Sequence, residues 1–333
     1  MSRSRRRPPL EIADTSVPAG RRRQLELPIT RLVSGTPVSV PLIVVHGSTD
    51  GPVVGLTAAI HGDELNGVEI IRRVMATVDP KTLAGTIIAA PVVNVLGFNT
   101  GDRYLPDRRD LNRSFPGSAR GTTASRIAHL VMTELVARVD VLIDLHTGSG
   151  GRTNLPQVRC DLRDEPTKDL ASIFAAPVTL HSSNRDGSLR RAATSQGVRV
   201  LLFEGGEALR FDPWSIGVGT EGVLRVLDSL EMIATIDVDA PPPTAWSESS
   251  RWLRASRSGM LHLDATLGDL VTAGDLVATI YDPFGKRLGR VTARGRGVVI
   301  GATQEPVVQR GDAVVHIAAV DEPPDVELLS PPE

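Results

Sequence analysis

The chain has 333 residues, of which 41% are hydrophobic and 23% are charged, and its formal net charge at pH 7 is −2. These values are typical of a soluble globular protein with two domains, and the near-neutral charge argues against a nucleic-acid-binding protein, which would carry a basic face. The single cysteine, Cys160, excludes an internal disulfide and a thiolate zinc cluster, so a transition metal here would need histidine and carboxylate ligands.

The first residues are basic, and residues 1–24 are predicted to form a disordered arm. This arm lacks the apolar stretch of a signal peptide, and no apolar run in the chain reaches the roughly 18 residues of a membrane span. We therefore expect a cytoplasmic protein with no membrane partner.

Residues 25–29 and 38–42 contain prolines and are predicted to be edge strands, since proline cannot donate a hydrogen bond to a neighbouring strand. The next strand ends at His46, where the lack of a nearby carboxylate favours a structural role.

From residue 53 to residue 147, apolar strands alternate with segments of helical periodicity. The predicted strands span residues 53–60, 85–94 and 139–145, and the predicted helices span residues 64–77 and 123–136. This alternation predicts an α/β fold in which a mostly parallel, mixed sheet has helices on both faces. In such folds, functional side chains gather beyond the carboxyl ends of the strands.

Side chains that can bind metal follow two of these strand ends. His61 and Glu64 lie three residues apart on the turn after the first strand, and His146 directly follows the third strand. Zinc hydrolases commonly hold their ion with two histidines and one glutamate and leave the fourth position to water. Asp144 lies on the same side of its strand as His146 and is predicted to orient that imidazole. The sequence therefore predicts one zinc ion at His61, Glu64 and His146.

A long polar loop, residues 94–121, follows the second of these strands. Its core, residues 103–117, holds four arginines within eleven positions, and Leu111, Phe115 and two prolines anchor it. Long ordered loops in compact domains are usually functional, and guanidinium groups bind carboxylates with two parallel hydrogen bonds. The loop therefore predicts a substrate that carries a carboxylate.

Three motifs stand out in this part of the chain. They are His-Gly-Asp-Glu at residues 61–64, Asp-Leu-Asn-Arg-Ser-Phe-Pro-Gly at residues 110–117 and Asp-Leu-His-Thr at residues 144–147. Together they resemble the signature of the succinylglutamate desuccinylase/aspartoacylase family, a branch of the zinc carboxypeptidase-like hydrolases, and their order and spacing match it over about residues 40–230. The resemblance implies a zinc-carboxypeptidase-like fold with one zinc ion per chain on the three ligands named above.

The resemblance also implies roles for residues in the arginine-rich loop. In that family, an Asn-Arg pair binds the substrate carboxylate, which corresponds to Asn112 and Arg113. A preceding arginine polarises the scissile carbonyl group. Arg103 is the best positional match for it, and Arg108 and Arg109 are the alternatives.

The predicted strand at residues 198–203 ends in Glu204, two glycines and Glu207. A carboxylate at the end of an apolar strand is what a general base beside a metal-activated water requires. The resemblance places the catalytic glutamate at Glu204, and Glu207 is the alternative. Arg190, in a small predicted helix before this strand, matches the neighbourhood of a substrate-binding arginine in related enzymes.

Two further loops, residues 148–165 and 180–191, are expected to line the acyl pocket. The first begins with a flexible glycine-rich stretch, so its sequence does not fix the direction of its side chains. Its arginines, Arg152, Arg159 and Arg163, either bind an acidic acyl group or are surface charges, and the second interpretation is favoured.

Composition changes at the end of the catalytic domain, which is predicted to span residues 25–236. Residues 237–252 contain three consecutive prolines and several serines and are predicted to be a linker. Residues 253–320 consist of short apolar segments punctuated by Gly-Asp turns, which predicts a small all-β barrel or sandwich domain, and residues 321–333 are predicted to be a flexible tail. The β domain resembles a biotinyl/lipoyl-like hammerhead without the carrier lysine. We therefore expect a lid or a homo-oligomer contact rather than an attached cofactor.

We expect a zinc-dependent amidohydrolase that removes the N-acyl group from a small N-acyl amino acid or a related carboxylate. Zinc would lower the pKa of a bound water toward neutrality, Glu204 would move its proton to the leaving amine, and Arg103 would stabilise the oxyanion. A carboxypeptidase-type metallopeptidase is the first alternative, and the additional C-terminal domain argues against it. The second alternative is a non-enzymatic relic with a binding or assembly role.

Overall fold

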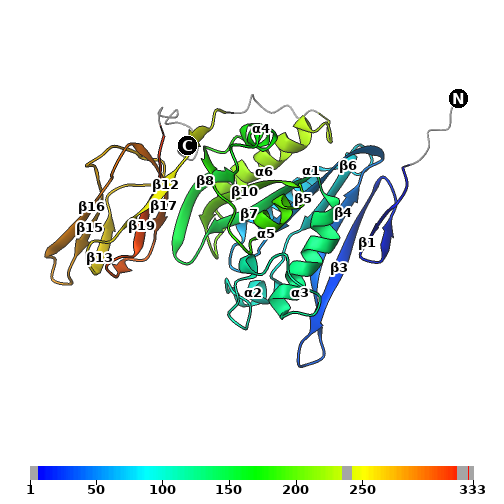
Figure 1. Ribbon diagram of the computed structural model, residues 1–333, viewed down its shortest axis with the longest axis horizontal. Coiled ribbons are helices and arrows are strands. Elements are labelled where there is room, and N and C mark those ends of the chain that lie inside the picture. Colours follow the sequence, from blue (N-terminus) through cyan, green and yellow to red (C-terminus); the bar gives the residue numbers. More distant parts are fainter. Residues whose placement is uncertain (1–6, 235–241, 321–328, 330–333) are drawn as a thin grey trace.

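The computed structural model describes residues 7–234, 242–320 and 329. Figure 1 shows an elongated molecule, with a helix-covered α/β region on the right and a region of strands on the left. One mixed sheet of 13 strands contains strands from both regions. The predicted α/β fold with additional C-terminal β structure is confirmed.

The main sheet has a parallel centre with antiparallel strands on both sides. In spatial order its continuous path is β12 (Ser250–Arg254), β19 (Ala313–Ala318), β17 (Gly297–Thr303), β8 (Arg152–Cys160), β10 (Arg199–Glu207), β7 (Val141–Gly148), β5 (Thr49–Ala58), β6 (Ala84–Ala90), β4 (Pro37–His46) and β3 (Arg21–Arg31). The shorter strands β9 (Val178–His181), β11 (Ala245–Ser247) and β14 (Leu270–Val271) pair beside this path, and β1 (Leu10–Ile12) pairs with β2 (Thr15–Val17) in a separate hairpin. Strands β10, β7, β5 and β6 are parallel, so their carboxyl ends lie at one edge of the sheet.

Helices cover both faces of the main sheet, as predicted. Helices α1 (Asn66–Thr77), α4 (Glu165–Phe174) and α6 (Pro213–Ser229) pack on one face, and α3 (Thr123–Leu130) and α5 (Leu189–Thr194) pack on the other. The short helix α2 (Val95–Thr100) begins the arginine-rich loop, and α3 continues as a π-helical turn (Val131–Leu135) and a 3-10 turn (Val136–Arg138). Aspartate, serine or threonine side chains cap α3, α4, α5 and α6, which fixes where these helices begin.

The predicted disordered arm is wrong for the residues that the structure describes. The β1–β2 hairpin buries Ile12 and Val17 in the core, and β3 begins at Arg21. The guanidinium group of Arg22 donates hydrogen bonds to two carbonyl groups at the C-terminal end of α1. Arg22 therefore caps a helix end, where the unpaired carbonyl groups carry partial negative charge. Residues 1–6 lie outside the described residues.

The C-terminal strands form two layers. A four-stranded sheet has the order β16 (Arg287–Thr292), β15 (Leu276–Tyr281), β13 (Gly259–Leu263) and β18 (Val307–Val308), while β12, β14, β17 and β19 belong to the main sheet. The antiparallel pairing of β17 with β8 joins the C-terminal strands to the α/β region. The predicted division into separate domains and the predicted homo-oligomer contact stay predictions.

The predicted linker and tail lie partly outside the described residues. Within the linker, residues 237–241 are not described, and the rest is not a free connection, because β11 pairs with β9 and β12 begins at Ser250. Within the tail, only Leu329 is described, and it is buried. Across the described ranges, no helix is both long enough and apolar enough to cross a membrane.

The packing of α6 against α4 gives a test of this arrangement. Gly222 of α6 lies against the ring of Phe174, and an added Cβ would stand 2.4 Å from its Cε1 atom. Because overpacking costs about 1–3 kcal/mol, Gly222→Ala should lower the free energy of unfolding by that amount in urea denaturation. Gly217→Ala in the same helix meets no atom within 4 Å, so it should be neutral or stabilising by up to about 1 kcal/mol. Equal losses in the two variants would contradict this packing.

Candidate active site

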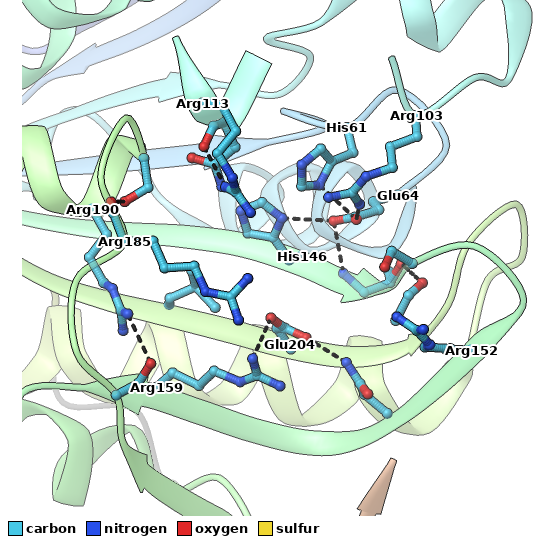
Figure 2. Close-up of a pocket in the computed structure, with 18 of the residues that line it drawn as sticks. His61, Glu64, Arg103, Arg113, His146, Arg152, Arg159, Arg185, Arg190 and Glu204 are labelled. Atoms are coloured by element: carbon cyan, nitrogen blue, oxygen red, sulfur yellow. Dashed lines mark hydrogen bonds and ion pairs between the residues drawn. The ribbon is translucent and has the colours of Figure 1, made fainter. Parts of the chain in front are cut away.

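Three parallel strands bring the predicted site residues to one edge of the main sheet. Strand β5 leads into the turn with His61 and Glu64, β7 carries His146, and β10 carries Glu204. Glu204 and His146 are register partners in adjacent strands. All four residues line one cavity of about 210 Å³ (Figure 2). Residues that are far apart in the chain are therefore neighbours in the fold.

His61, Glu64 and His146 form a buried cluster that could hold a metal ion. One ligand atom from each residue lies within 4.8 Å of the others. The Nδ1 atoms of His61 and His146 lie 2.7 Å from Oε1 and Oε2 of Glu64, respectively. Both imidazoles thus direct the same ring nitrogen toward one carboxylate, and Figure 2 shows the three side chains converging.

Two aspartates hold the other nitrogen of each imidazole. Asp144 Oδ2 lies 2.9 Å from Nε2 of His146, and Asp110 Oδ1 lies 3.3 Å from Nε2 of His61. Thr57 donates a hydrogen bond of 2.7 Å to the second oxygen of Asp144. A carboxylate in this position fixes the orientation of a ligating histidine and raises its basicity. Asp144 has the geometry of its predicted role, and Asp110 holds the same position for His61, which the sequence did not reveal.

The charges in the cluster fit a divalent cation. Burial opposes ionisation of Glu64, but His61 and His146 outweigh it and hold the pKa of this carboxyl well below its ordinary value. Burial also opposes a charge on His146, but Asp144 and Glu64 hold its pKa well above the ordinary value. The surroundings therefore keep the carboxylate ionised and favour positive charge beside it. Two imidazole nitrogens and one ionised carboxylate form a donor set typical of a catalytic zinc site.

Of the three arginines considered for polarising the carbonyl group, only Arg103 lines the cavity. Its guanidinium group lies 3.0 Å from Oε1 of Glu64 and 3.4 Å from Oδ2 of Asp110. Arg108 and Arg109 are exposed, and each pairs with a nearby aspartate of the same loop. The loop therefore places one guanidinium group beside the cluster and turns the other two away.

Asn112, Arg113 and Arg190 also line the cavity. Asn112 is buried, and its Oδ1 accepts a hydrogen bond of 2.9 Å from the backbone N–H of Leu189 at the start of α5. Arg190 is buried as well, and its Nη2 donates to Oγ of Ser182 at 2.9 Å, while Nη1 has no hydrogen-bond partner in the described part of the chain. A buried nitrogen without a partner carries a desolvation cost, which an anionic ligand would remove.

Glu204 faces the cavity, whereas Glu207 pairs with the exposed Arg210 outside it. Oε2 of Glu204 accepts a hydrogen bond of 2.5 Å from Nδ2 of Asn154, and Oε1 lies 3.3 Å from Nη1 of Arg159. Both partners lie on β8, within the segment that the sequence analysis treats as a loop. The two possible positions of the general base therefore have very different surroundings.

Residues of both expected pocket segments, 148–165 and 180–191, line the cavity, but the first segment contains the strand β8 rather than a loop, and the part played by β12 was not predicted. Arg152 and Arg159 line the cavity rather than the open surface, and Trp252 of β12 lines it too. The guanidinium carbon of Arg152 lies 5.0 Å from the centre of the Trp252 ring, within cation–π range. Arg163 is exposed, as predicted. The alternation of polar and apolar residues along β8 was an available signal, but Pro156 and the preceding glycines obscured it.

Comparison with known proteins identifies the family. A family model of the succinylglutamate desuccinylase/aspartoacylase catalytic domain matches residues 50–230. The chain belongs to this family. It is therefore a hydrolase that acts on linear amides, and the resemblance seen in the three motifs is confirmed.

Several relatives match nearly the whole chain. The N-alpha-acetyl-L-2,4-diaminobutyric acid deacetylase of Halomonas elongata is 29% identical over 314 residues, which cover 90% of this chain and 91% of that protein. The crystal structure of a succinylglutamate desuccinylase/aspartoacylase from Rhodobacter sphaeroides is 26% identical and has a TM-score of 0.82, covering 94% of this chain and 100% of that chain. The product-bound ectoine utilization protein EutE of Ruegeria pomeroyi, at 24% identity, has a TM-score of 0.81 over 90% of this chain and 97% of that chain, which shows the shared fold.

The wall that contains Trp252 also holds a buried histidine. The ring of His316 stacks on that of Trp252 with the centroids 4.6 Å apart, and its Nε2 lies 2.9 Å from Oγ of Ser250. Burial, together with the charges of Arg159 and Arg152, lowers the pKa of His316 to about 3. The folded protein therefore keeps this imidazole neutral over most of the accessible pH range.

This low pKa of His316 predicts that acid lowers the free energy of unfolding of the protein. The pKa of a histidine is near 6.5 in the unfolded chain, and the pKa of His316 is about 3 in the folded protein. Between these pH values only the unfolded chain binds the proton. Unfolding is therefore favoured as the pH falls through this window. His316→Phe keeps a ring against Trp252 and should remove up to about 1.4 kcal/mol of pH dependence per pH unit in this window. Urea unfolding of both proteins at about pH 7 and about pH 5 measures the difference. An unchanged pH dependence in the variant would contradict the neutral, buried state of His316.

Proposed function

We propose that this protein is a zinc-dependent amidohydrolase that removes the N-acyl group from a small N-acyl amino acid or a related carboxylate. The observation that carries the proposal is the buried cluster of His61, Glu64 and His146, which shares one cavity with Glu204 and several arginines. One Zn²⁺ per chain, held by these three residues, would lower the pKa of a water ligand toward neutrality and polarise the scissile carbonyl group. The N-acetyl amino acid deacetylase among the relatives supports this substrate class.

Asn112 and Arg113 would bind the carboxylate of the substrate. A guanidinium group can make two parallel hydrogen bonds to a carboxylate, which fixes its orientation as well as its position. The turn that carries both residues is held by Asp110, whose side chain accepts a hydrogen bond of 2.8 Å from the backbone N–H of Asn112. Arg190 would contribute to substrate binding through its buried and unpartnered Nη1 atom.

Arg103 would stabilise the negative charge that develops on the carbonyl oxygen. Its guanidinium group is held beside the cluster by Glu64 and Asp110, so it is already oriented before the substrate binds. Preorganised donors of this kind typically contribute about 3–4 kcal/mol to catalysis, because little reorganisation is needed as the charge forms.

Glu204 would act as the general base and then as the general acid. It would accept a proton from the water whose oxygen forms a bond to the amide carbon, and it would return that proton to the amide nitrogen as the C–N bond breaks. The products are the free acid of the acyl group and the free amine. Support comes from the place of Glu204 in the cavity wall, in register with His146 on the neighbouring strand.

The cavity favours a small anionic substrate over a long peptide. Its volume is about 210 Å³, and Trp252 from the C-terminal strands forms part of its wall. Two carboxylates, Glu64 and Glu204, line it together with six arginines, which are Arg103, Arg113, Arg152, Arg159, Arg185 and Arg190. This excess of positive charge attracts anions. The presence of the complete set of proposed ligands and base argues against a non-enzymatic relic.

A hydrolysis screen of the purified, zinc-loaded protein tests the proposal. We expect release of free amine from at least one substrate in a panel of N-acetyl and N-succinyl amino acids, and no cleavage of peptides at their C-terminus. Chelation should abolish the activity and added Zn²⁺ should restore it, because the metal activates the water. Cleavage of the peptides would instead support the metallopeptidase alternative, and hydrolysis of neither class would contradict an enzymatic role.

The matched control for this screen is Glu204→Gln, which keeps the size of the side chain and removes the base. This variant should retain zinc and lose about 100- to 10,000-fold in kcat. Near-normal turnover would remove Glu204 from the role of base and leave the assignment of the metal ligands untouched.

A further inference from the structure

We infer that strand β17 of the C-terminal region positions Glu204 for catalysis by holding the two β8 side chains that bind its carboxylate. The inference rests on the proposed function, in which Glu204 is the general base. Ile300 and Gly301 of β17 touch no reacting group, so they are positioning residues that act through Asn154, Gln157 and Arg159 of β8.

The first connection runs from Gly301 to Oε2 of Glu204. β17 pairs with β8 so that Gly301 is the register partner of Asn154. The backbone of Gly301 lies so close to the Asn154 side chain that an added Cβ would stand 2.8 Å from its Oδ1 atom. The amide is therefore confined on this side, and its Nδ2 donates the hydrogen bond of 2.5 Å to Glu204. A glycine in the middle of a strand is typical of such a close approach.

The second connection runs from Ile300 to Oε1 of Glu204. The carbonyl oxygen of Ile300 accepts a hydrogen bond of 3.0 Å from Nε2 of Gln157, whose side chain is fully buried. Oε1 of Gln157 accepts a bond of 3.4 Å from Nε of Arg159. Nη1 of Arg159 then lies 3.3 Å from Oε1 of Glu204. Two adjacent residues of β17 are thus linked to the two oxygens of one carboxylate.

A carboxylate with both oxygens held cannot rotate freely about its last side-chain bonds. A general base must stand within hydrogen-bond reach of the proton that it takes, and a small misplacement lowers the rate strongly. The C-terminal strands would therefore contribute to kcat itself, in addition to placing Trp252 in the cavity wall. This role does not require any motion of the C-terminal strands or a second copy of the chain.

Gly301→Ala tests the first connection directly. The new methyl group would stand 2.8 Å from Oδ1 of Asn154 and 3.3 Å from Cβ of His316. The closer atom is the free end of a side chain, so the cheapest response is for the Asn154 amide to swing away from Glu204. On the best substrate of the hydrolysis screen, we expect about a tenfold loss in kcat, the scale of one hydrogen bond to a charged group, with little change in KM or zinc content.

Asn154→Ala and the double variant complete a cycle. Asn154→Ala should lower kcat about 10- to 100-fold, and adding Gly301→Ala to it should have no further effect, because the displaced side chain is gone. Val299→Ala is the control, since Val299 lies on the same strand and its buried side chain belongs to the C-terminal core cluster. It should lower Tm and leave kcat unchanged. If Gly301→Ala does not fold, Gln157→Met breaks the second connection within β8 and should also lower kcat at constant KM.

Several results would overturn the inference. The first is a Gly301→Ala variant with normal kcat. The second is a loss of kcat from Gly301→Ala that is as large in the Asn154→Ala background as in the unmodified protein. The third is a Val299→Ala variant that loses kcat together with Tm. Glu204→Gln separates this inference from the proposed function. If that variant is inactive while Gly301→Ala and Asn154→Ala are fully active, the positioning role fails and Glu204 remains the base. If Glu204→Gln is fully active, the proposed base is wrong.

Discussion

The buried carboxylate of Glu64 is the group on which the rest of the site depends. Both of its oxygens face an imidazole nitrogen, and Arg103 lies beside one of them. A carboxylate removed from water is costly unless charged or hydrogen-bonded partners surround it. The turn after β5, the end of β7 and the arginine-rich loop must therefore meet at this one side chain. The same requirement favours a cation at the cluster, because the surroundings favour positive charge beside the carboxylate.

The order of strands in the main sheet extends this arrangement across the cavity. β10 lies beside β7 and carries Glu204, β8 lies beside β10 and carries the partners of Glu204, and β17 lies beside β8. Going outward from the cluster, successive strands of the sheet carry the candidate ligand His146, the proposed base Glu204 and then the residues that bind the Glu204 carboxylate. Strands of the C-terminal region thus belong to the same sheet as the candidate site residues, which is how they would affect the proposed chemistry without touching the substrate.

The sequence predicted the centre of the site well, because its signals are local. His61 and Glu64 directly follow one apolar run of the sequence and His146 follows another, and each run is bounded by polar, glycine-containing segments. The outer parts depend on contacts between distant segments. Its position in the motif favoured Arg103 over Arg108, but the sequence left both open, since only the folded loop brings one of them to Glu64. The basic arm forms β1, β2 and part of β3 because its apolar residues pack into the core. The strand β8 was not predicted, because all of its partners, β9, β10 and β17, follow it in the chain and β17 lies about 140 residues away.

Metal analysis of the purified protein and of His146→Ala tests the proposed zinc site. We expect one zinc ion per chain in the unmodified protein and loss of zinc from the variant, since removal of one imidazole leaves only two ligands from the chain. His262→Ala, at an exposed histidine of β13, is the matched control and should bind zinc normally. Full zinc occupancy in His146→Ala would contradict the account.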